Sequence, residues 1–441
     1  MIKKILTITL LIFYSLNAKA ELSKIEIDKI YGARFKVSAS SIGQSDYHSK
    51  ESDAVLDKIF EIIKNDLSIT PDIDFYGIVN HQTEENIIDV KRYDFFGINF
   101  NININIAPKD IKTGDYFIEI KVYNVKNGDV LAEKRYQFNI KNLRKTSHIA
   151  SDISYFAITG KSGYFQSKLL FTSNDQVKNI KSTTSIYMID LDGFGEKIIL
   201  QGGLLNNPSL DVENKAIIYN DLTTGVSKLK AANILTKEKI NLDSLYKITQ
   251  EGEDSILNSA SLCNTKKCIL YSEEFGNKGY IKLASPQFNR TLVSSDISTS
   301  VNVSPDDSEI VYEARRNGRR NLYKMNIETP FGTEEMLTGF DGIYAEPKYS
   351  PDGGWIVFNK LRNKIFHIGI IRPDKTEEQI IYSEYLISNP TFMPNSDAII
   401  FSEKTSPTAK PRLKIIDLDG RVIKTIETSI GATNPHLWTI R

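Results

Sequence analysis

The fold is decided by the stretch Pro347-Lys348-Tyr349-Ser350-Pro351-Asp352-Gly353-Gly354-Trp355-Ile356-Val357-Phe358. A short apolar strand leads into a polar four-residue turn, and a second apolar strand closes on an aromatic residue, which is the pattern of a tight β-hairpin. The same pattern recurs at residues 208–219, 260–271, 301–312 and 390–401.

The residues that close the copies recur at a nearly constant interval. They are Tyr219, Tyr271, Tyr312, Phe358 and Phe401. Their spacings of 52, 41, 46 and 43 residues match the length of one propeller blade. Because a lone hairpin cannot bury both of its faces, copies of it must stack around a closed ring.

Two partial copies predict how many blades there are and how the ring closes. Residues 167–171 hold only the closing half of the pattern, and residues 434–438 hold only the opening half. Together they make one blade, in which the C-terminal segment adds the innermost strand to strands from about residues 166–201. Such closure removes two exposed sheet edges. We therefore expect a six-bladed all-β propeller over residues 161–441.

The residues before the propeller predict a separate α/β domain over residues 21–160. Residues 52–67 carry apolar side chains at helical spacing. Residues 98–106 alternate Ile or Phe with Asn, which predicts a half-buried strand with its Asn side chains on the polar face.

The rest of this domain follows the same logic. Residues 116–122 alternate again, and Asn127-Gly128 turns the chain back as a hairpin into residues 131–140. A last helix with apolar residues at steps of three and four ends at Gly160.

The N-terminus predicts export. Residues 1–20 contain Lys3 and Lys4, an apolar run from residue 5 to 16 and the small-x-small pattern Ala18-Lys19-Ala20, which are typical of a cleaved signal peptide. The alternative is an uncleaved anchor, but the run is too short to span a bilayer. We expect a mature periplasmic chain that begins at Glu21.

The charge balance excludes no class of partner, but it gives no sign of nucleic-acid binding. The 55 Lys and Arg residues balance 55 Asp and Glu residues, so the chain has no basic footprint. The two cysteines, Cys263 and Cys268, flank the turn of one repeat. They either form a cross-strand disulfide in an oxidising compartment or remain two reduced thiols.

Motifs upstream of the propeller carry a family resemblance. The segment from residue 143 to 165 contains Leu143-Arg144-Lys145, His148, Asp152, Tyr155, Thr159-Gly160, Gly163 and Phe165, and residues 122–132 add Val-Tyr-Asn-Val and Gly128. In this order, and followed by six blades, these residues resemble the TolB family of the Tol-Pal system of Gram-negative bacteria. The resemblance covers nearly the whole mature chain.

The resemblance implies a non-enzymatic periplasmic adaptor without a cofactor. Such a protein binds TolA of the inner membrane through its N-terminal segment and the lipoprotein Pal through one propeller face. It links the two membranes peripherally, supports outer-membrane integrity and takes part in constriction at cell division. We also expect the chain to be a monomer.

The expected TolA-binding segment is the first stretch of the mature chain, from Glu21 to about residue 33. Its predicted contact residues are Glu21, Ile25, Glu26, Ile27 and Asp28. Apolar and charged residues interleave there, so the segment can pair as an added strand. The alternative is an ordinary edge strand of the first domain.

The expected Pal-binding surface is a ring of residues around one mouth of the propeller channel. Each of them directly precedes an innermost strand pattern: Asn207, Ser259, Ser300, Glu346, Asn389 and Asn434. The alternative is that these polar residues only cap turns, since a polar residue often precedes Pro there.

An arginine-rich turn is expected on the same face. Arg316 and Arg319 lie within the run from residue 315 to 320, around an Asn-Gly turn, and can grip partner carboxylates. A solvated surface turn is the alternative. A basic rim would make association sensitive to salt.

Two further classes of function stay open at this stage. One is a propeller hydrolase or lactonase, and the other is a peptidoglycan- or polysaccharide-binding module. The chain has no Gly-x-Ser-x-Gly, His-Glu-x-x-His or phosphate-loop motif, and we predict no catalytic residue and no metal site. The predicted ring offers Glu346 as its only carboxylate, and His148 is expected to be a packed or surface histidine.

Overall fold

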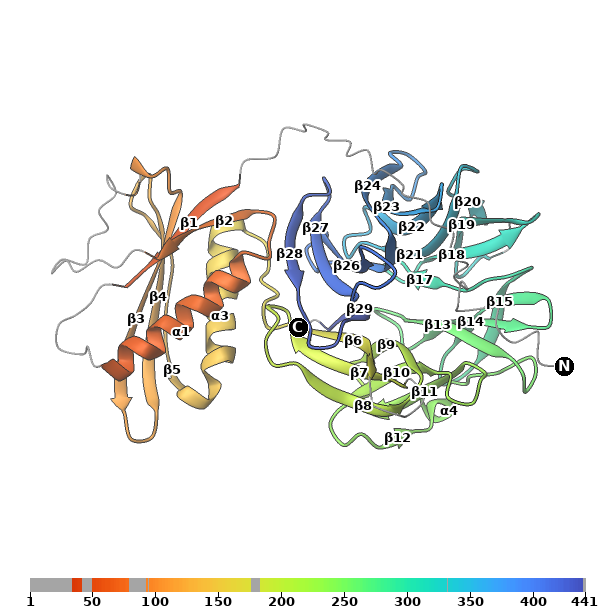
Figure 1. The fold of residues 1–441 in the computed structure, drawn as a ribbon, viewed down its shortest axis with the longest axis horizontal. Helices are drawn as coiled ribbons and strands as arrows, with labels where there is room; N and C mark the ends of the chain where they lie inside the picture. Colours follow the sequence, from red (N-terminus) through yellow and green to blue (C-terminus); the bar gives the residue numbers. More distant parts are fainter. Residues whose placement is uncertain are drawn as a thin grey trace.

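The structure, a computed structural model, describes residues 34–41, 50–78, 93, 95–175, 183–330 and 332–438. It contains a small α/β domain beside a ring of β-sheets (Figure 1). The predicted signal peptide, residues 1–20, lies outside the described residues, and so does the predicted TolA-binding segment with Glu21, Ile25, Glu26, Ile27 and Asp28. No described helix is long and apolar enough to cross a membrane.

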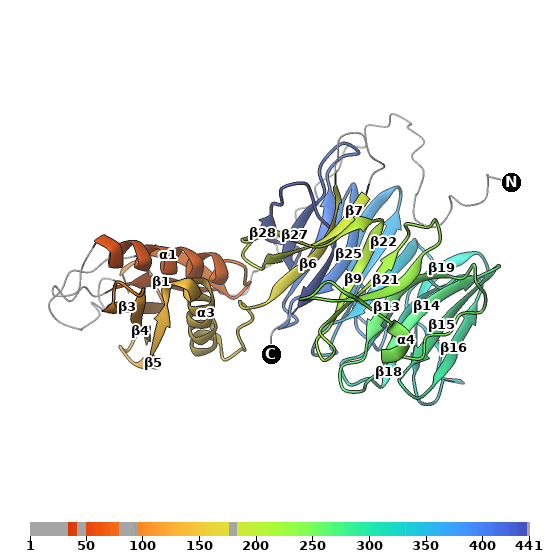
Figure 2. The same cartoon turned by 90° about the horizontal axis from the view of Figure 1, so that it is seen from below.

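The first domain is a five-stranded sheet in the order β2-β1-β3-β4-β5, with two helices packed on one face (Figure 2). Strand β1 runs parallel to β2 and β3, whereas β3, β4 and β5 are antiparallel. The elements are β1 (Phe35–Ser40), α1 (Lys50–Leu67), β2 (Ile73–Ile78), β3 (Phe100–Asp110), β4 (Asp115–Asn124), β5 (Val130–Asn139), η1 (Ile140–Asn142) and α3 (Leu143–Thr159).

The apolar periodicity explains both helices. In α1 the side chains at the predicted positions are buried: Val55, Ile59, Ile62, Ile63 and Leu67. Helix α3 ends where Gly160 adopts a left-handed φ of 73° and its N–H caps the carbonyl of Phe156, because glycine takes this conformation without a Cβ clash.

The polar face of β3 differs from the expectation. Asn101 and Asn103 are 0% and 1% exposed, so the strand is buried on both sides over this stretch. Their amides bond to β1, where Asn101 Nδ2 donates to Ser38 Oγ at 2.9 Å and Asn103 Nδ2 to Ser40 Oγ at 3.2 Å. The alternating pattern predicted that the Asn face of the strand lies outside the core, and this prediction was wrong. Amides and hydroxyls that hydrogen-bond to one another can be buried at little cost.

From β6 onward, the described residues form six four-stranded sheets arranged as the blades of a propeller. The first three blades are β9 (Leu205–Asp211), β10 (Ala216–Asp221), β11 (Lys228–Asn233), β12 (Lys239–Ile240); β13 (Ile256–Leu262), β14 (Ile269–Phe275), β15 (Lys278–Ala284), β16 (Asn289–Ser295); and β17 (Val301–Val303), β18 (Glu309–Arg316), β19 (Arg319–Asn326), β20 (Glu335–Met336). The next two are β21 (Ile343–Tyr349), β22 (Ile356–Arg362), β23 (Ile365–Ile371), β24 (Gln379–Glu384); and β25 (Leu386–Phe392), β26 (Ala398–Lys404), β27 (Arg412–Asp417), β28 (Val422–Ile426). A short helix, α4 (Leu242–Leu245), follows β12.

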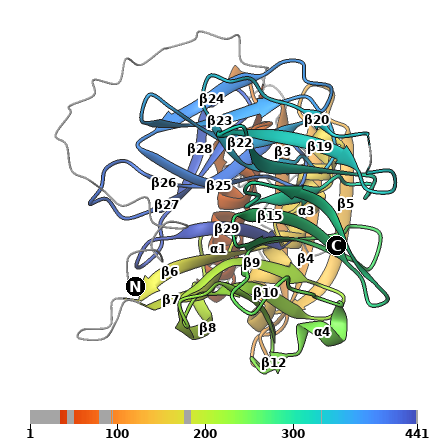
Figure 3. The same cartoon turned by 90° about the vertical axis from the view of Figure 1, so that its right-hand side faces the viewer.

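The sixth blade combines the two ends of the repeat region. Its order is β29-β6-β7-β8, with β6 (Lys168–Asp175), β7 (Thr183–Asp190), β8 (Lys197–Gly203) and β29 (Thr433–Trp438). Strand β29 lies beside β6 (Figure 3) and pairs antiparallel with it, Leu437 opposite Leu169. The predicted six-bladed propeller and its closure by the C-terminal strand are confirmed.

Closure predicts a strong dependence of stability on β29. A chain that ends at Gly431 lacks β29. Strand β6 then loses its pairing partner, and the innermost strands of the two neighbouring blades, β9 and β25, lose a packing contact. We expect it to lose more than about 5 kcal/mol of unfolding free energy, or to fail to fold cooperatively. Urea unfolding followed by circular dichroism measures this. The control is a chain that ends at Trp438, and equal stability of the two chains would contradict the role of closure.

Candidate functional site

The six predicted ring residues all line one channel through the propeller. The channel has a volume of about 1550 Å³, and its wall includes Asn207, Ser259, Ser300, Glu346, Asn389 and Asn434. In five blades the innermost strand runs from this ring toward the polar turn of its own hairpin, as β25 does from Asn389 to the turn after Phe392. The sixth innermost strand, β29, runs from Asn434 antiparallel to β6. The channel therefore has a ring mouth, formed by these six residues, and an opposite turn mouth.

A repeated β-bulge sets the ring residues apart from their strands. Strand pairing shifts register at Asn207, Glu346, Asn389 and Asn434. These residues take left-handed φ values of 46°, 53°, 51° and 52° respectively. Asparagine tolerates this conformation well, whereas Glu346 is the unusual member. Bulges of this kind bend a strand and redirect a side chain.

Several ring residues bond to the blade that follows. Glu346 accepts a hydrogen bond from the backbone N–H of Asn389 at 2.6 Å, and Asn389 Nδ2 donates to Asn434 Oδ1. Asn207 Nδ2 donates to the carbonyl of Asn258 at 3.0 Å. These ring residues therefore connect neighbouring blades in addition to forming part of a surface, so their role is not limited to capping turns.

A second set of blade-joining residues escaped the sequence prediction. Each directly follows the closing aromatic of its blade, and all are at most 5% exposed: Thr172, Asn220, Ser272, Glu313, Asn359 and Ser402. Asn220 Nδ2 donates to the carbonyl of Leu257 at 2.6 Å, and Ser402 Oγ to that of Ala432 at 2.9 Å. A polar residue after the aromatic in every copy was the signal that could have found them.

The ring mouth holds more carboxylates than the predicted ring. Glu274 and Glu313 line the channel together with Glu346. Burial raises the pKa of all three carboxyl groups. Arg320 Nη1 donates to Glu313 Oε1 at 2.9 Å and balances one of the charges. Counting the ring alone therefore underestimated the acidity of this mouth.

The arginine turn divides its side chains between two faces. Arg315 pairs with Arg320 across the β18–β19 hairpin, and Arg316 pairs with Arg319. Arg315 and Arg320 line the channel. Arg316 instead bonds to Glu334, and the Arg319 guanidinium lies 4.8 Å from the Phe340 ring centroid. The predicted pair Arg316 and Arg319 thus faces away from the channel wall, because alternate strand residues point to opposite sides.

The turn mouth contains a disulfide. Cys263 and Cys268 are bonded to each other and enclose residues 264–267. Three successive backbone N–H groups of this turn donate to the Asp307 carboxylate in the next blade: those of Asn264, Thr265 and Lys266, at 2.7, 2.7 and 2.9 Å. The closed turn acts as an anion-binding nest for a neighbouring side chain.

The Asp307 contact predicts a pH-dependent contribution to stability. Burial opposes ionisation, but the hydrogen bonds from the 264–266 turn lower the pKa of Asp307 below its ordinary value of 3.8. A carboxyl group with a depressed pKa stabilises the fold above pH 3.8, and this stabilising contribution is lost as the pH falls. Asp307→Asn should cost about 1–3 kcal/mol at neutral pH and less in acid.

Urea unfolding at several pH values tests this contribution. The matched control is Asp306→Asn, because the hydrogen bonds of Asp306 with described residues stay within its own turn, to Ser304 and Ser308. An equal effect of the two substitutions at all pH values would show that the contact between blades contributes nothing.

The first domain docks at the turn mouth. Lys161 follows α3 and pairs with Asp397 at 3.0 Å, in the turn between β25 and β26. Asn395 of the same turn donates to the carbonyl of Ser162 at 3.1 Å. The described part of the first domain therefore occupies the side of the propeller opposite the ring mouth.

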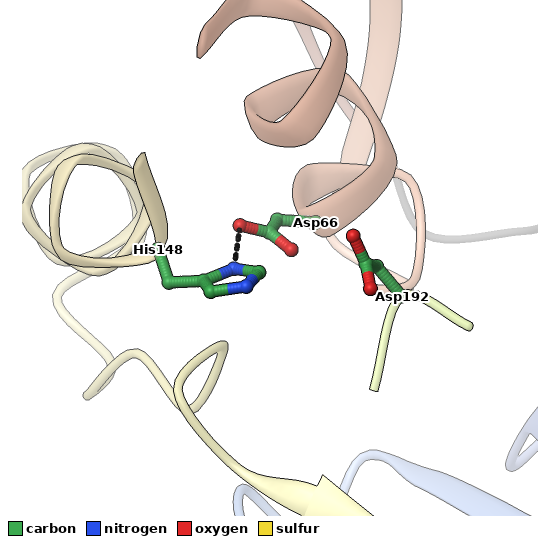
Figure 4. Close-up of side chains that lie close together, drawn as sticks. All are labelled: Asp66, His148 and Asp192. Carbon is green, nitrogen blue, oxygen red and sulfur yellow. Dashed lines mark hydrogen bonds and ion pairs between the residues drawn. The ribbon is translucent and has the colours of Figure 1, made fainter. Parts of the chain in front are cut away.

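A buried charge cluster joins the same two parts of the chain (Figure 4). His148 of α3 lies 2.8 Å from Asp66 at the end of α1, and Arg144 Nη2 donates to both oxygens of Asp192, after β7, at 2.8 Å. His148 Nε2 also lies 3.8 Å from Asp190. His148 is thus buried in an ion pair with Asp66 inside the first domain, and its second ring nitrogen faces Asp190 of the propeller.

Asp66, His148 and Asp192 also offer ligand atoms within 4.8 Å of one another, as a metal site would. The electrostatics do not fit one. Burial lowers the pKa of His148, but its bonds to Asp190 and Asp66 outweigh burial and raise it to about 9. His148 Nδ1 already bonds to Asp66, and Arg144 engages both oxygens of Asp192, so these ligand atoms are used within the cluster.

The charge cluster around His148 predicts a loss of stability at high pH. A histidine pKa raised from 6.5 to about 9 stabilises the folded state fully below pH 6.5, and this contribution is lost as the pH rises through 9. Burial also raises the pKa of Asp66 to about 6, so both side chains are charged only between about pH 6 and pH 9. The free energy of unfolding of wild type should exceed that of His148→Gln by at most about 3 kcal/mol at pH 7, and the excess should shrink as the pH rises through 9. Urea unfolding at graded pH measures it, and a difference that grows with pH would overturn the assignment.

The geometry defines a class: a six-bladed propeller with a polar channel, whose turn mouth carries an α/β domain. The family model described as TolB beta propeller domain matches residues 155–440, which is more than half of the chain. The chain belongs to this family.

Individual relatives agree with the family. The Tol-Pal system protein TolB of Wolbachia sp. subsp. Drosophila simulans (strain wRi) is 26% identical over 333 residues, covering 75% of this chain and 78% of the relative. The Tol-Pal system protein TolB of Gluconobacter oxydans (strain 621H) is 24% identical over 347 residues, covering 76% of this chain and 74% of the relative. The crystal structure of TolB from Acinetobacter baumannii superposes with a TM-score of 0.76 at 17% identity, over 94% of this chain and 98% of that one, and so has the same fold.

Proposed function

We propose that this chain is the TolB-like adaptor of a periplasmic Tol-Pal system, and that it binds Pal at the ring mouth and TolA through residues 21–33. The relatives named as Tol-Pal system proteins support the system, and the family resemblance supports the two partners. Export follows from the predicted signal peptide. A role in outer-membrane integrity and cell division follows from the system.

One observation favours the ring mouth as the partner surface. The first domain contacts the propeller at the turn mouth, through Arg144 with Asp192 and through Tyr155 with Asn395. A partner at the turn mouth would have to share that space. The ring mouth combines exposed arginine with acidic groups around a polar channel, which suits a polar, salt-sensitive protein interface.

Binding of the mature chain from Glu21 to the soluble domain of the host's Pal, measured by calorimetry, tests this proposal. Because Glu346 and Asn389 also join blades, the sharper variant is Arg315→Glu. Arg315 is exposed on the channel rim, and its side chain makes no hydrogen bond or ion pair with the described residues. We expect it to weaken binding at least about tenfold by charge reversal. Raising the salt concentration should weaken the wild-type complex as well.

The matched control is Lys266→Glu, which makes the same charge reversal at the turn mouth, where Lys266 is 54% exposed. It should leave Pal binding unchanged. Absence of binding at low salt, or loss of binding only in the turn-mouth variant, would contradict the proposed surface.

A further inference from the structure

A second layer of side chains lies in the channel below the ring. It is formed by the residue two positions beyond each ring residue on the six innermost strands, and every member lines the channel: Ser209, Ser261, Asn302, Lys348, Thr391 and His436. Three consecutive blades supply Lys348, Thr391 and His436. This layer therefore places a cation and an imidazole around a small polar space.

Lys348 is the unusual member of this layer. Its ammonium donates to Thr391 Oγ1 at 2.5 Å, and among the described residues it makes no ion pair. The charge of Glu346 acts on Lys348, but Glu346 Oε2 already accepts hydrogen bonds from Asn359 and from the N–H of Asn389. Ammonium groups inside proteins are normally paired, because desolvation of an unpaired charge is costly. Burial lowers the pKa of Lys348 to about 8.

The neighbours of Lys348 present donors to the channel. His436 Nε2 accepts the N–H of Leu210 at 3.3 Å, so the neutral ring carries its proton on Nδ1. Burial, aided by the charge of Lys348, lowers the pKa of His436 to about 4, which keeps the ring neutral at pH 7. Thr391 Oγ1 accepts from Lys348 and keeps its own O–H to donate.

In two other members of the layer, Ser261 and Asn302, the acceptor atoms are also occupied. Ser261 Oγ accepts from Asn302 Nδ2 at 3.1 Å, and Asn302 Oδ1 accepts from the N–H of Tyr349 at 2.9 Å. Their acceptor atoms are therefore engaged within the wall, while the Ser261 hydroxyl proton can point into the channel. A layer rich in free donors around one ammonium suits an anion and does not suit a metal cation.

We propose that the layer formed by Lys348, Thr391 and His436 is an oxyanion-binding site, in which a carboxylate or phosphate pairs with the Lys348 ammonium. The inference goes beyond the adaptor function and does not depend on it. The oxyanion is either a free small ion or a carboxylate on a protein side chain that enters from the ring mouth. Both sources offer the same chemistry to the site.

Thermal unfolding of the mature chain with each of three probes tests the site. The probes are inorganic phosphate, acetate and N-acetyl-glutamic acid amide, each at a series of concentrations with chloride keeping the ionic strength constant. A ligand that binds only the folded state raises the melting temperature with concentration. A response to phosphate alone indicates a free phosphate, and a response to acetate and the blocked glutamate indicates a carboxylate.

Two variants separate the site from general salt effects. Lys348→Met keeps the length of the side chain and removes the charge, so it should fold at least as well as wild type while its apparent affinity falls at least about tenfold. Lys266→Met removes a charge at the turn mouth and should respond as wild type does. The proposal is overturned if none of the probes acts on wild type, or if Lys348→Met responds equally.

Proton linkage provides an independent readout. Because the anion favours the charged form of Lys348, binding near pH 8 should take up protons, and the affinity should fall as the pH rises above that value. Calorimetry in buffers of different ionisation enthalpy measures the uptake, which Lys348→Met should abolish. Binding without proton uptake near pH 8 would contradict a role for this lysine.

Discussion

The structure depends on the pairing of β29 with β6, which joins the last strand of the chain to the first strand of the propeller. A row of blades without this pairing would leave two open edges and no enclosed axis. Closure creates a channel with two distinct mouths. The innermost strands all run in the same direction, so equivalent positions of the repeat lie at the same level and form a layer around the channel. Each layer therefore combines side chains from several blades, which no single blade could bring together.

The two mouths have different roles for a physical reason. The turn mouth supplies carboxylates such as Asp192 and Asp397, which Arg144 and Lys161 neutralise from the first domain. These ion pairs tie the domain to one side of the propeller. Four of the six ring residues lie in β-bulges, which redirect the strand backbone, and polar groups line this entrance.

Much of the fold was predictable from the sequence, because the spacing of aromatic residues and the two half-copies specify the number of blades and the closing strand. The blade-joining polar residues were visible after each aromatic but carry no separate signal of burial. Asn101 and Asn103 were expected on an exposed face, and only their contacts with Ser38 and Ser40 show why they are buried. The predicted ring residues do share one channel mouth. The split between Arg315 and Arg316 and the isolation of Lys348 depend on strand register and distance, which a sequence does not provide.

Hydrogen exchange of the mature chain, with and without the soluble domain of Pal, tests the central claim most directly, because it maps the partner surface without any substitution. The account predicts slower exchange in the segments that form the ring mouth, at the starts of β9, β21 and β25 and in the β18–β19 turn. Protection confined to the turn mouth around residues 264–267 and 393–397, or no change anywhere, would contradict it.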